Sequence, residues 1–262
     1  MERTSSSRRK LQRTHHGARK LISVIVPSLN EEKLLPGCLE QFTPEIRERF
    51  SIEVIVSDGG SQDNTVGIAT AYADKLVVHE DIHRRQTISE GRNRGADAAS
   101  GTILIFLNAD TRIANPTTFF ERISIRFSLD PTLAALAVKV QVFPSERKFI
   151  DTIFHSFFNR YVRFLNTIGI GAGRGECQIV RRAVFQAVKG YNEHYPAGED
   201  FDLYNRISHF GNVAFDKRLL VFESPRRYRK YGYFRVYRDW VRNGVRTFFH
   251  REAASGVWEE VR

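Results

Sequence analysis

Three short polar clusters, each closing an apolar run, constrain the fold most. The runs are 21–26, 52–56 and 103–107, and the clusters that follow them are Pro27-Ser28-Leu29-Asn30-Glu31, Ser57-Asp58-Gly59-Gly60-Ser61-Gln62-Asp63 and Asn108-Ala109-Asp110. Continuous apolar runs of about six residues are typical of parallel strands buried on both faces. Because open α/β folds bind ligands at the carboxyl ends of such strands, the sequence predicts a binding site at that edge.

Segments of helical composition separate these runs. Residues 34–42 place their apolar side chains on one helical face, and residues 65–72 are rich in alanine. A short strand is expected at 75–78, and residues 88–99 have helical composition but weak periodicity. Strands and helices therefore alternate over roughly 21–115, which predicts an α/β sheet.

A fourth cluster, Gly198-Glu199-Asp200-Phe201-Asp202, adds acids well downstream. It follows a Gly-rich segment, 169–175, and a short expected strand, 177–180. The Gly-rich segment is not a Walker loop, because no Gly-Lys-Ser/Thr follows it. One interpretation of the acids is a charged first turn that offsets a helix dipole, which suits Asp202. The other is a general base.

The order and spacing of the four clusters resemble those of family 2 glycosyltransferases, over about residues 21–223. The resemblance implies an α/β protein of GT-A fold, with a Rossmann-like mixed sheet flanked by helices. It also implies a catalytic domain over 21–224, divided into a nucleotide-sugar half, 21–115, and an acceptor half, 116–224. Residues 1–20 are then expected to form a basic disordered tail, and 225–262 a basic, aromatic, amphipathic helical extension.

The same resemblance implies roles for individual residues. Asp200 would be the general base, Glu199 would orient the acceptor, and Asp110 would meet a Mg²⁺ or Mn²⁺ ion bound to the diphosphate. Asn108 stands where the family element has its first Asp. The implied nucleotide-sugar contacts are Pro27, Ser28, Asn30, Glu31, Asp58, Gly59, Arg92, Asn108, Ala109 and Asp110.

Elementary chemistry also supports these roles for the acids, but less specifically than the resemblance does. A carboxylate at the end of a buried strand is costly to desolvate without a partner, and a ribose hydroxyl or divalent cation supplies one. Since Mg²⁺ typically takes one or two protein carboxylates and completes its shell with water and phosphates, Asp110 alone is not too few. The alternatives are structural: Asp58 as the cap of a turn before Gly59-Gly60, and Asp110 as a turn or N-cap residue.

The formal net charge of +10 is unevenly distributed. Residues 1–20 carry +6 and residues 217–251 carry +9, whereas 21–216 carry −3 and 252–262 carry −2. The expected catalytic body is therefore not basic, but its two ends are.

Two stretches have the apolar periodicity of amphipathic helices. They are Ile150, Ile153, Phe154, Phe157, Phe158, Tyr161, Leu165 and Ile168, and an Arg-flanked set of Tyr233, Phe234, Tyr237, Trp240, Val241, Val245, Phe248 and Phe249. Such helices usually pack on their own core. An Arg-flanked aromatic helix also suits the headgroup region of an anionic membrane. Both interpretations remain open at this point.

Other sequence features bear on the location of the protein and on the state of its cysteines. No apolar stretch approaches the roughly 18–20 residues that span a bilayer, and residues 1–20 lack the apolar core of a signal peptide. We therefore expect a cytoplasmic location, including the cytoplasmic membrane face. Cys38 and Cys177 have no metal-type spacing and are expected to be core thiols.

The predicted function is an inverting, metal-assisted glycosyltransferase that uses a nucleotide-sugar, with UDP-sugars favoured, and an acceptor that is lipid-linked or membrane-associated. A polyprenyl-phosphate sugar synthase is the alternative within this class. A nucleic-acid-binding protein could instead use the basic C-terminal segment. A nucleotidyltransferase is disfavoured, because such enzymes carry a Gly-rich basic phosphate loop after the first strand and Pro27-Ser28-Leu29-Asn30-Glu31 is not one.

Overall fold

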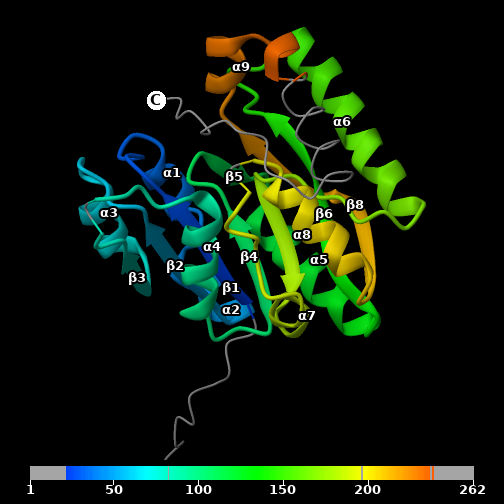
Figure 1. Ribbon diagram of the computed structural model, residues 1–262, viewed down its shortest axis with the longest axis horizontal. Helices are drawn as coiled ribbons and strands as arrows, with labels where there is room; N and C mark the ends of the chain where they lie inside the picture. Colours follow the sequence, from blue (N-terminus) through cyan, green and yellow to red (C-terminus); the bar gives the residue numbers. More distant parts are fainter. Residues whose placement is uncertain (1–21, 82, 196, 237, 239–262) are drawn as a thin grey trace, which may run out of the picture.

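The computed structural model describes residues 22–81, 83–195, 197–236 and 238, and shows one mixed sheet between two layers of helices (Figure 1). The eight strands of the sheet lie in the order β3-β2-β1-β4-β7-β6-β8-β5. Their bounds are β1 Ile22–Ser28, β2 Ile52–Asp58, β3 Lys75–Val78, β4 Ile103–Leu107, β5 Thr111–Ile113, β6 Leu133–Val142, β7 Cys177–Arg181 and β8 Asn212–Glu223.

Each face of the sheet is covered by its own set of helices and has its own apolar core. Helices α1, α2, α3 and α5 contribute to the core on one face, and α4, α7 and α8 to the core on the other. The helices are α1 Leu35–Leu39, α2 Pro44–Phe50, α3 Thr65–Tyr72, α4 Ile88–Asp97, α5 Pro116–Leu129, α6 Phe149–Thr167, α7 Arg182–Ala187, α8 Glu199–Ser208 and α9 Arg226–Tyr231.

The first half of the sheet is parallel, as the alternation of strands and helices predicts. Strand β1 pairs in parallel with β2 and β4, and the register sets Ser28 opposite Asp58. Helix α4 forms despite its weak periodicity because Thr87 and Glu90 make a reciprocal capping box at its start. Gly95 lets α4 approach the sheet closely, since a Cβ there would lie 2.4 Å from Cγ2 of Ile25.

The second half of the sheet changes direction. Strand β7 is antiparallel to both β4 and β6, β6 is parallel to β8, and β5 is antiparallel to β8. The sheet is therefore mixed, as expected. The long strands β6 and β8 and the helix α5 were not predicted from the sequence.

The predicted ends of the chain fall largely outside the described residues. The expected tail at 1–20 lies outside them, as does most of the extension at 225–262. The described part of that extension contains α9, which lies beside α6 (Figure 1). Among the described helices, none is long and apolar enough to cross a membrane.

Helix α6 forms as predicted, but its buried face includes polar residues and many of its large apolar side chains are exposed. Asp151, His155 and Asn159 are buried, together with Phe158 and Val162. Its exposed large apolar residues recur every three or four positions and are Phe149, Ile150, Ile153, Phe157, Tyr161 and Phe164, continued by Ile168 just after the helix. We call this set the α6 apolar stripe.

Candidate active site

A cavity of about 530 Å³ lies at the carboxyl ends of β1, β2 and β4 and extends to the starts of α8 and α9. It brings ten of the residues singled out in the sequence into one lining. They are Pro27, Ser28, Glu31, Gly59, Arg92, Asn108, Ala109, Asp110, Glu199 and Asp200. Asn30 and Asp58 are not part of that lining. Acids from the loops after β1 and β4 and from the start of α8 therefore meet in one space.

Asp58 is fully buried and held by the turn that follows it. Its Oδ1 accepts hydrogen bonds from the backbone N–H groups of Gly60 (2.9 Å) and Ser61 (2.8 Å). Its Oδ2 accepts from the hydroxyl of Ser61 (2.5 Å) and, at 3.4 Å, from that of Ser28. This is the turn-capping arrangement left open in the sequence, and a nucleoside contact of Asp58 stays a prediction.

Asn30 joins the loops after β1 and β2. Its Oδ1 accepts from the backbone N–H of Gln62 (2.8 Å), and its own N–H donates to the hydroxyl of Ser61 (2.8 Å). Its φ of 52° is in the left-handed region, which Asn tolerates better than most residues. Asn30 and Asp58 therefore fix the wall of the cavity from behind.

Asp110, Glu31 and Arg226 form an ionic cluster at the cavity edge. The Nη2 atom of Arg226 lies 3.1 Å from Oδ2 of Asp110, and the guanidinium also donates to both carboxylate oxygens of Glu31, at 2.5 and 3.0 Å. Burial raises the pKa of Asp110 and of Glu31 above their ordinary values, and Arg226 opposes the rise in both. A cationic partner is therefore what these two carboxylates need to stay ionised.

The donor set of this cluster fits a cation shared with phosphates. Carboxylate oxygens are the hard ligands that Mg²⁺ prefers. In the described ranges there is no group of three or more His, Cys, Asp or Glu side chains arranged to hold a metal. Asp110, with Glu31 nearby, would therefore hold a divalent ion only together with the oxygens of a bound diphosphate.

Arg92 connects the end of β4 to the start of α8. It is 1% exposed, and it donates to Oε1 of Glu199 (2.8 Å), Oδ1 of Asn108 (3.2 Å) and the carbonyl of Gly175 (2.9 Å). Its guanidinium also lies 5.1 Å from the ring centroid of Tyr191. These contacts are all with the protein itself, so the direct approach of Arg92 to a nucleotide stays a prediction.

Asp200 lies in the first turn of α8 and lines the cavity. Its Oδ1 accepts a hydrogen bond from the backbone N–H of Phe201 (2.9 Å). Burial, and next the negative charge of Glu199, raise the pKa of Asp200 to about 7, against the opposing charge of Arg92. A carboxylate with a pKa near the working pH is well matched to general-base catalysis. Asp202, by contrast, pairs with Arg206 at 2.6 Å within the same helix.

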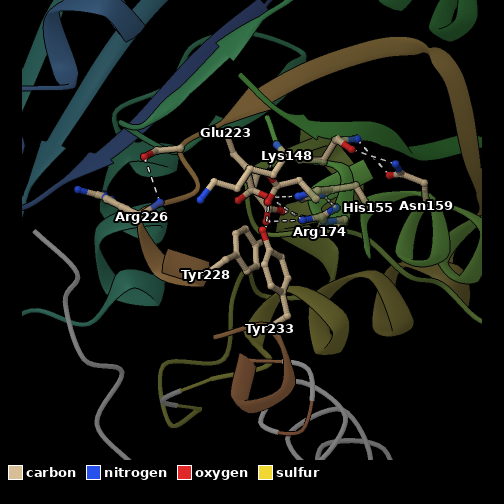
Figure 2. A network of polar contacts seen from close by, with 12 residues as sticks. Lys148, His155, Asn159, Arg174, Glu223, Arg226, Tyr228 and Tyr233 are labelled. Carbon is tan, nitrogen blue, oxygen red and sulfur yellow. Dashed lines mark hydrogen bonds and ion pairs between the residues drawn. The ribbon is translucent and has the colours of Figure 1, made fainter. Parts of the chain in front are cut away.

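A second buried network lines the same cavity, and sequence reasoning missed it. Arg174 donates to Glu176 (2.8 Å) and Glu223 (3.0 Å), and the hydroxyl of Tyr228 donates to the same oxygen of Glu223 (2.8 Å). Figure 2 shows Arg174, His155 and Tyr228 gathered around Glu223. Burial and the neighbouring Glu176 raise the pKa of Glu223 well above its usual value, and the charge of Arg174 opposes the rise.

The available signals for these residues were weak. Arg174 stands inside the Gly-rich segment, and Glu223 ends the stretch that resembles the family. Arg226 and Tyr228 entered the sequence argument only through the charge and aromatic content of the C-terminal segment. Nothing in the local spacing indicates that Arg226 reaches back to Asp110 after β4, or that Tyr228 bonds Glu223 at the end of β8.

Solved structures identify the class of fold as GT-A. A mannosyltransferase from Pyrobaculum calidifontis, in complex with GDP-Man and Mn²⁺, matches with a TM-score of 0.66 at 20% identity, covering 90% of this chain, which spans 64% of that protein's length. Glucosyl-3-phosphoglycerate synthase from Mycobacterium tuberculosis, with Mn²⁺, UDP and glucosyl-3-phosphoglycerate, matches with a TM-score of 0.62 at 17% identity, covering 90% and 82%.

The chain belongs to glycosyl transferase family 2, whose family model matches residues 23–189. A "PGL/p-HBAD biosynthesis glycosyltransferase" of Mycobacterium tuberculosis (strain H37Ra) is 30% identical over 211 residues, which is 78% of this chain and 75% of the relative. The chain is therefore a glycosyltransferase, and the predicted family, fold class and enzyme class are confirmed. Family membership also favours the enzyme over the nucleic-acid-binding alternative.

Proposed function

We propose that the protein transfers a sugar from a nucleotide-sugar to an acceptor with inversion at the anomeric carbon. The observation that carries the proposal is the single cavity in which Asp110 and Asp200 meet, although they come from different halves of the domain. An inverting displacement requires a base on the acceptor side and positive charge on the leaving-group side. Asp200 and the cluster around Asp110 supply these two requirements.

In this proposal the chain's own residues divide the work as follows. Asp200 accepts the proton of the acceptor hydroxyl while the hydroxyl oxygen bonds to the anomeric carbon and the nucleoside diphosphate departs. Glu199, fixed by Arg92, orients the acceptor. The loops after β1 and β2 hold the nucleoside. A divalent ion bound at Asp110 would stabilise the charge of the departing diphosphate.

A thermal-shift panel tests the donor. UDP, GDP and their sugars are each added with and without Mn²⁺ or Mg²⁺, because a ligand that binds only the native state raises its stability. We expect the largest shift with a UDP-sugar and metal. The variant Asp110→Asn should lose the part of the shift that depends on metal, and product analysis by NMR should show the inverted anomer. The retained anomer, or no shift with any nucleotide, contradicts the proposal.

We further propose that the acceptor is lipid-linked and that the enzyme reaches it at the cytoplasmic face of an anionic membrane. The α6 apolar stripe supports this part. Phe158 of α6 lines the cavity, whereas the stripe on the same helix faces outward. A membrane bound by the stripe would therefore lie close to the cavity.

Charge on α6 favours an anionic surface. The helix carries one acid, Asp151, which is buried and paired with Arg229 at 2.6 Å. Arg160 and Arg163 are exposed on the helix, and Arg147 and Lys148 are exposed just before it. Each basic residue near an anionic surface contributes about 1 kcal/mol, and exposed aromatic side chains suit the headgroup region.

Flotation with liposomes tests the membrane part. The intact protein should float with vesicles containing phosphatidylserine at low salt and float less with neutral vesicles. Phe157→Ser together with Phe164→Ser should reduce flotation, whereas Leu129→Ser together with Phe210→Ser, which also removes two exposed apolar side chains but from other elements, should not. Equal flotation of both double variants would remove the α6 apolar stripe from the proposal.

The polyprenyl-phosphate alternative makes a different demand on Asp200. A phosphate acceptor is already ionised near neutral pH, so a base contributes little to its attack. If Asp200→Asn keeps most of the activity while donor binding is normal, the acceptor is an ionised group rather than a hydroxyl.

A further inference from the structure

Arg226 holds the position where a cation would meet the acids of the donor side. It is the first residue of α9, and it reaches carboxylates from two separate loops: Glu31 after β1 and Asp110 after β4. Its side chain is 25% exposed, that of Asp110 is 19% exposed and that of Glu31 is 16% exposed. The cluster is therefore partly shielded from water but open to the cavity.

Other contacts of α9 keep Arg226 aimed at these acids. Tyr228 donates to Glu223, and Arg229 is paired with Asp151 of α6. The ring of Tyr233 stacks on that of Tyr228, with centroids 5.2 Å apart and planes nearly parallel. Figure 2 shows the rings of Tyr228 and Tyr233 side by side below Glu223. Because α9 is anchored on this side, Arg226 is presented to the donor side as a fixed element.

The guanidinium of Arg226 supplies the positive charge beside Glu31 and Asp110 that a divalent ion would otherwise supply. Glu31 and Asp110 lie against the same guanidinium, so their negative charges repel each other and the arginine offsets that repulsion. Oδ2 of Asp110 lies 3.1 Å from Nη2 of Arg226, so this oxygen is already engaged by the arginine and is not free for a metal. A divalent ion at the same oxygen would also be repelled by the guanidinium at that range.

We propose that Arg226 is an internal competitor of the divalent cation, which must displace the guanidinium from Asp110 in order to bind. This inference rests on the proposed role of Asp110 as a metal ligand. It makes α9 a determinant of metal affinity, although α9 supplies no metal ligand. Metal binding would then be weak in the free enzyme and favoured when a diphosphate adds its own oxygens to the site.

Direct measurement of bound Mn²⁺ tests the competition without an activity assay. Free Mn²⁺ is followed by electron paramagnetic resonance during titration of the full-length protein, first alone and then with UDP. We expect Arg226→Gln to bind Mn²⁺ roughly tenfold more tightly than the unmodified protein without UDP, since hydrogen bonds between charged groups are commonly of this strength. Arg226→Lys, which keeps the charge but loses the two-pronged geometry, should fall between them.

Two controls isolate the pair. Lys230→Gln also removes one positive charge from α9, at an exposed position, and should change the affinity less than twofold. Arg226→Gln combined with Asp110→Asn should bind Mn²⁺ no more tightly than Asp110→Asn alone. Circular dichroism of each variant checks that α9 and the sheet remain folded.

The outcomes separate this inference from the proposed function. If the unmodified protein binds Mn²⁺ in the presence of UDP but Arg226→Gln binds it no more tightly, the competition is overturned and the metal role of Asp110 stands. A gain in affinity that persists after Asp110→Asn also overturns it. If the unmodified protein binds no Mn²⁺ even with UDP, the metal role falls, and the competition with it.

Discussion

Asp58 ends β2 behind the cavity wall, whereas Asp200 begins α8 in the cavity lining, and the surroundings of these two acids differ. The carboxylate of Asp58 accepts four hydrogen bonds from the protein. Three come from Gly60 and Ser61 in its own turn, and the fourth comes from the hydroxyl of Ser28. One backbone N–H meets Asp200, which also faces the negative charge of Glu199. The hydrogen-bonding capacity of Asp58 is met within the protein, whereas burial and the charge of Glu199 make ionisation of Asp200 unfavourable. Acids of the second kind are typical of catalytic sites.

Replacing Asp200 gives the largest expected effect. Asp200→Asn removes the proton acceptor and leaves the shape of the side chain, so kcat for a hydroxyl acceptor should fall by about 10² to 10⁴. Steady-state kinetics measure the loss, and the thermal shift with UDP and Mn²⁺ should change little, because the nucleotide is held elsewhere in the cavity.

The matched control for this change is in the same helix turn. Asp202→Asn removes an acid that pairs with Arg206 and should leave kcat within about threefold, because a partly exposed ion pair contributes roughly 1 kcal/mol or less. Equal losses from Asp200→Asn and Asp202→Asn would mean that α8, and not a particular base, limits the rate.

The raised pKa of Asp200 gives the next effect, on the pH dependence of transfer. The active form is the ionised one, so log(kcat/KM) should rise with pH up to about 7 and then level off. Below that value the rate should change about tenfold per pH unit. A plateau that extends down to pH 5 would show that Asp200 is already ionised there.

The same shift affects stability with a defined sign. The pKa of Asp200 is about 7 in the folded state, against an ordinary value of 3.8. Between these values the folded state binds more protons than the unfolded state, so the contribution of Asp200 is fully present below about pH 4 and is lost as pH rises towards 7. Asp200→Asn lacks this dependence. Its melting temperature relative to the unmodified protein should therefore increase from pH 5 to pH 7.5, as measured by calorimetry.

The parallel half of the fold was predictable because its signals are local. Buried runs such as 52–56 indicate strands, and the turn residues after them indicate where each strand ends. The first three clusters therefore predicted which edge of the sheet carries the site. Ten of the twelve predicted site residues line one cavity, although their roles remain predictions. The acids could be found in the sequence because each follows an apolar run or begins a helix.

What could not be predicted depends on contacts between distant segments. The partner of Asp110 is Arg226, and the partner of Asp58 is its own turn, yet both acids follow a buried strand in the sequence. Helix α6 shows the same limit. Its periodicity predicted an amphipathic helix, but only the structure shows that Asp151, His155 and Asn159 are buried while the α6 apolar stripe is exposed. Which face of a helix is buried depends on the residues of other segments that it packs against.

The smallest expected effect on catalysis is at Asp58, where the comparison predicts a role in stability. Asp58→Asn keeps an oxygen that can accept from Gly60 and Ser61, so stability should change by less than about 1 kcal/mol. Asp58→Ala leaves buried donors without partners and should cost about 1 to 3 kcal/mol in urea unfolding. Both variants should keep kcat within a few-fold at saturating donor. If Asp58→Asn instead raises the KM for the donor at least tenfold without loss of stability, then Asp58 contacts the nucleoside as the family resemblance implies. Asp58 and Asp200 would then differ in the ligand that each acid binds, and no longer in how many hydrogen bonds each receives from the protein.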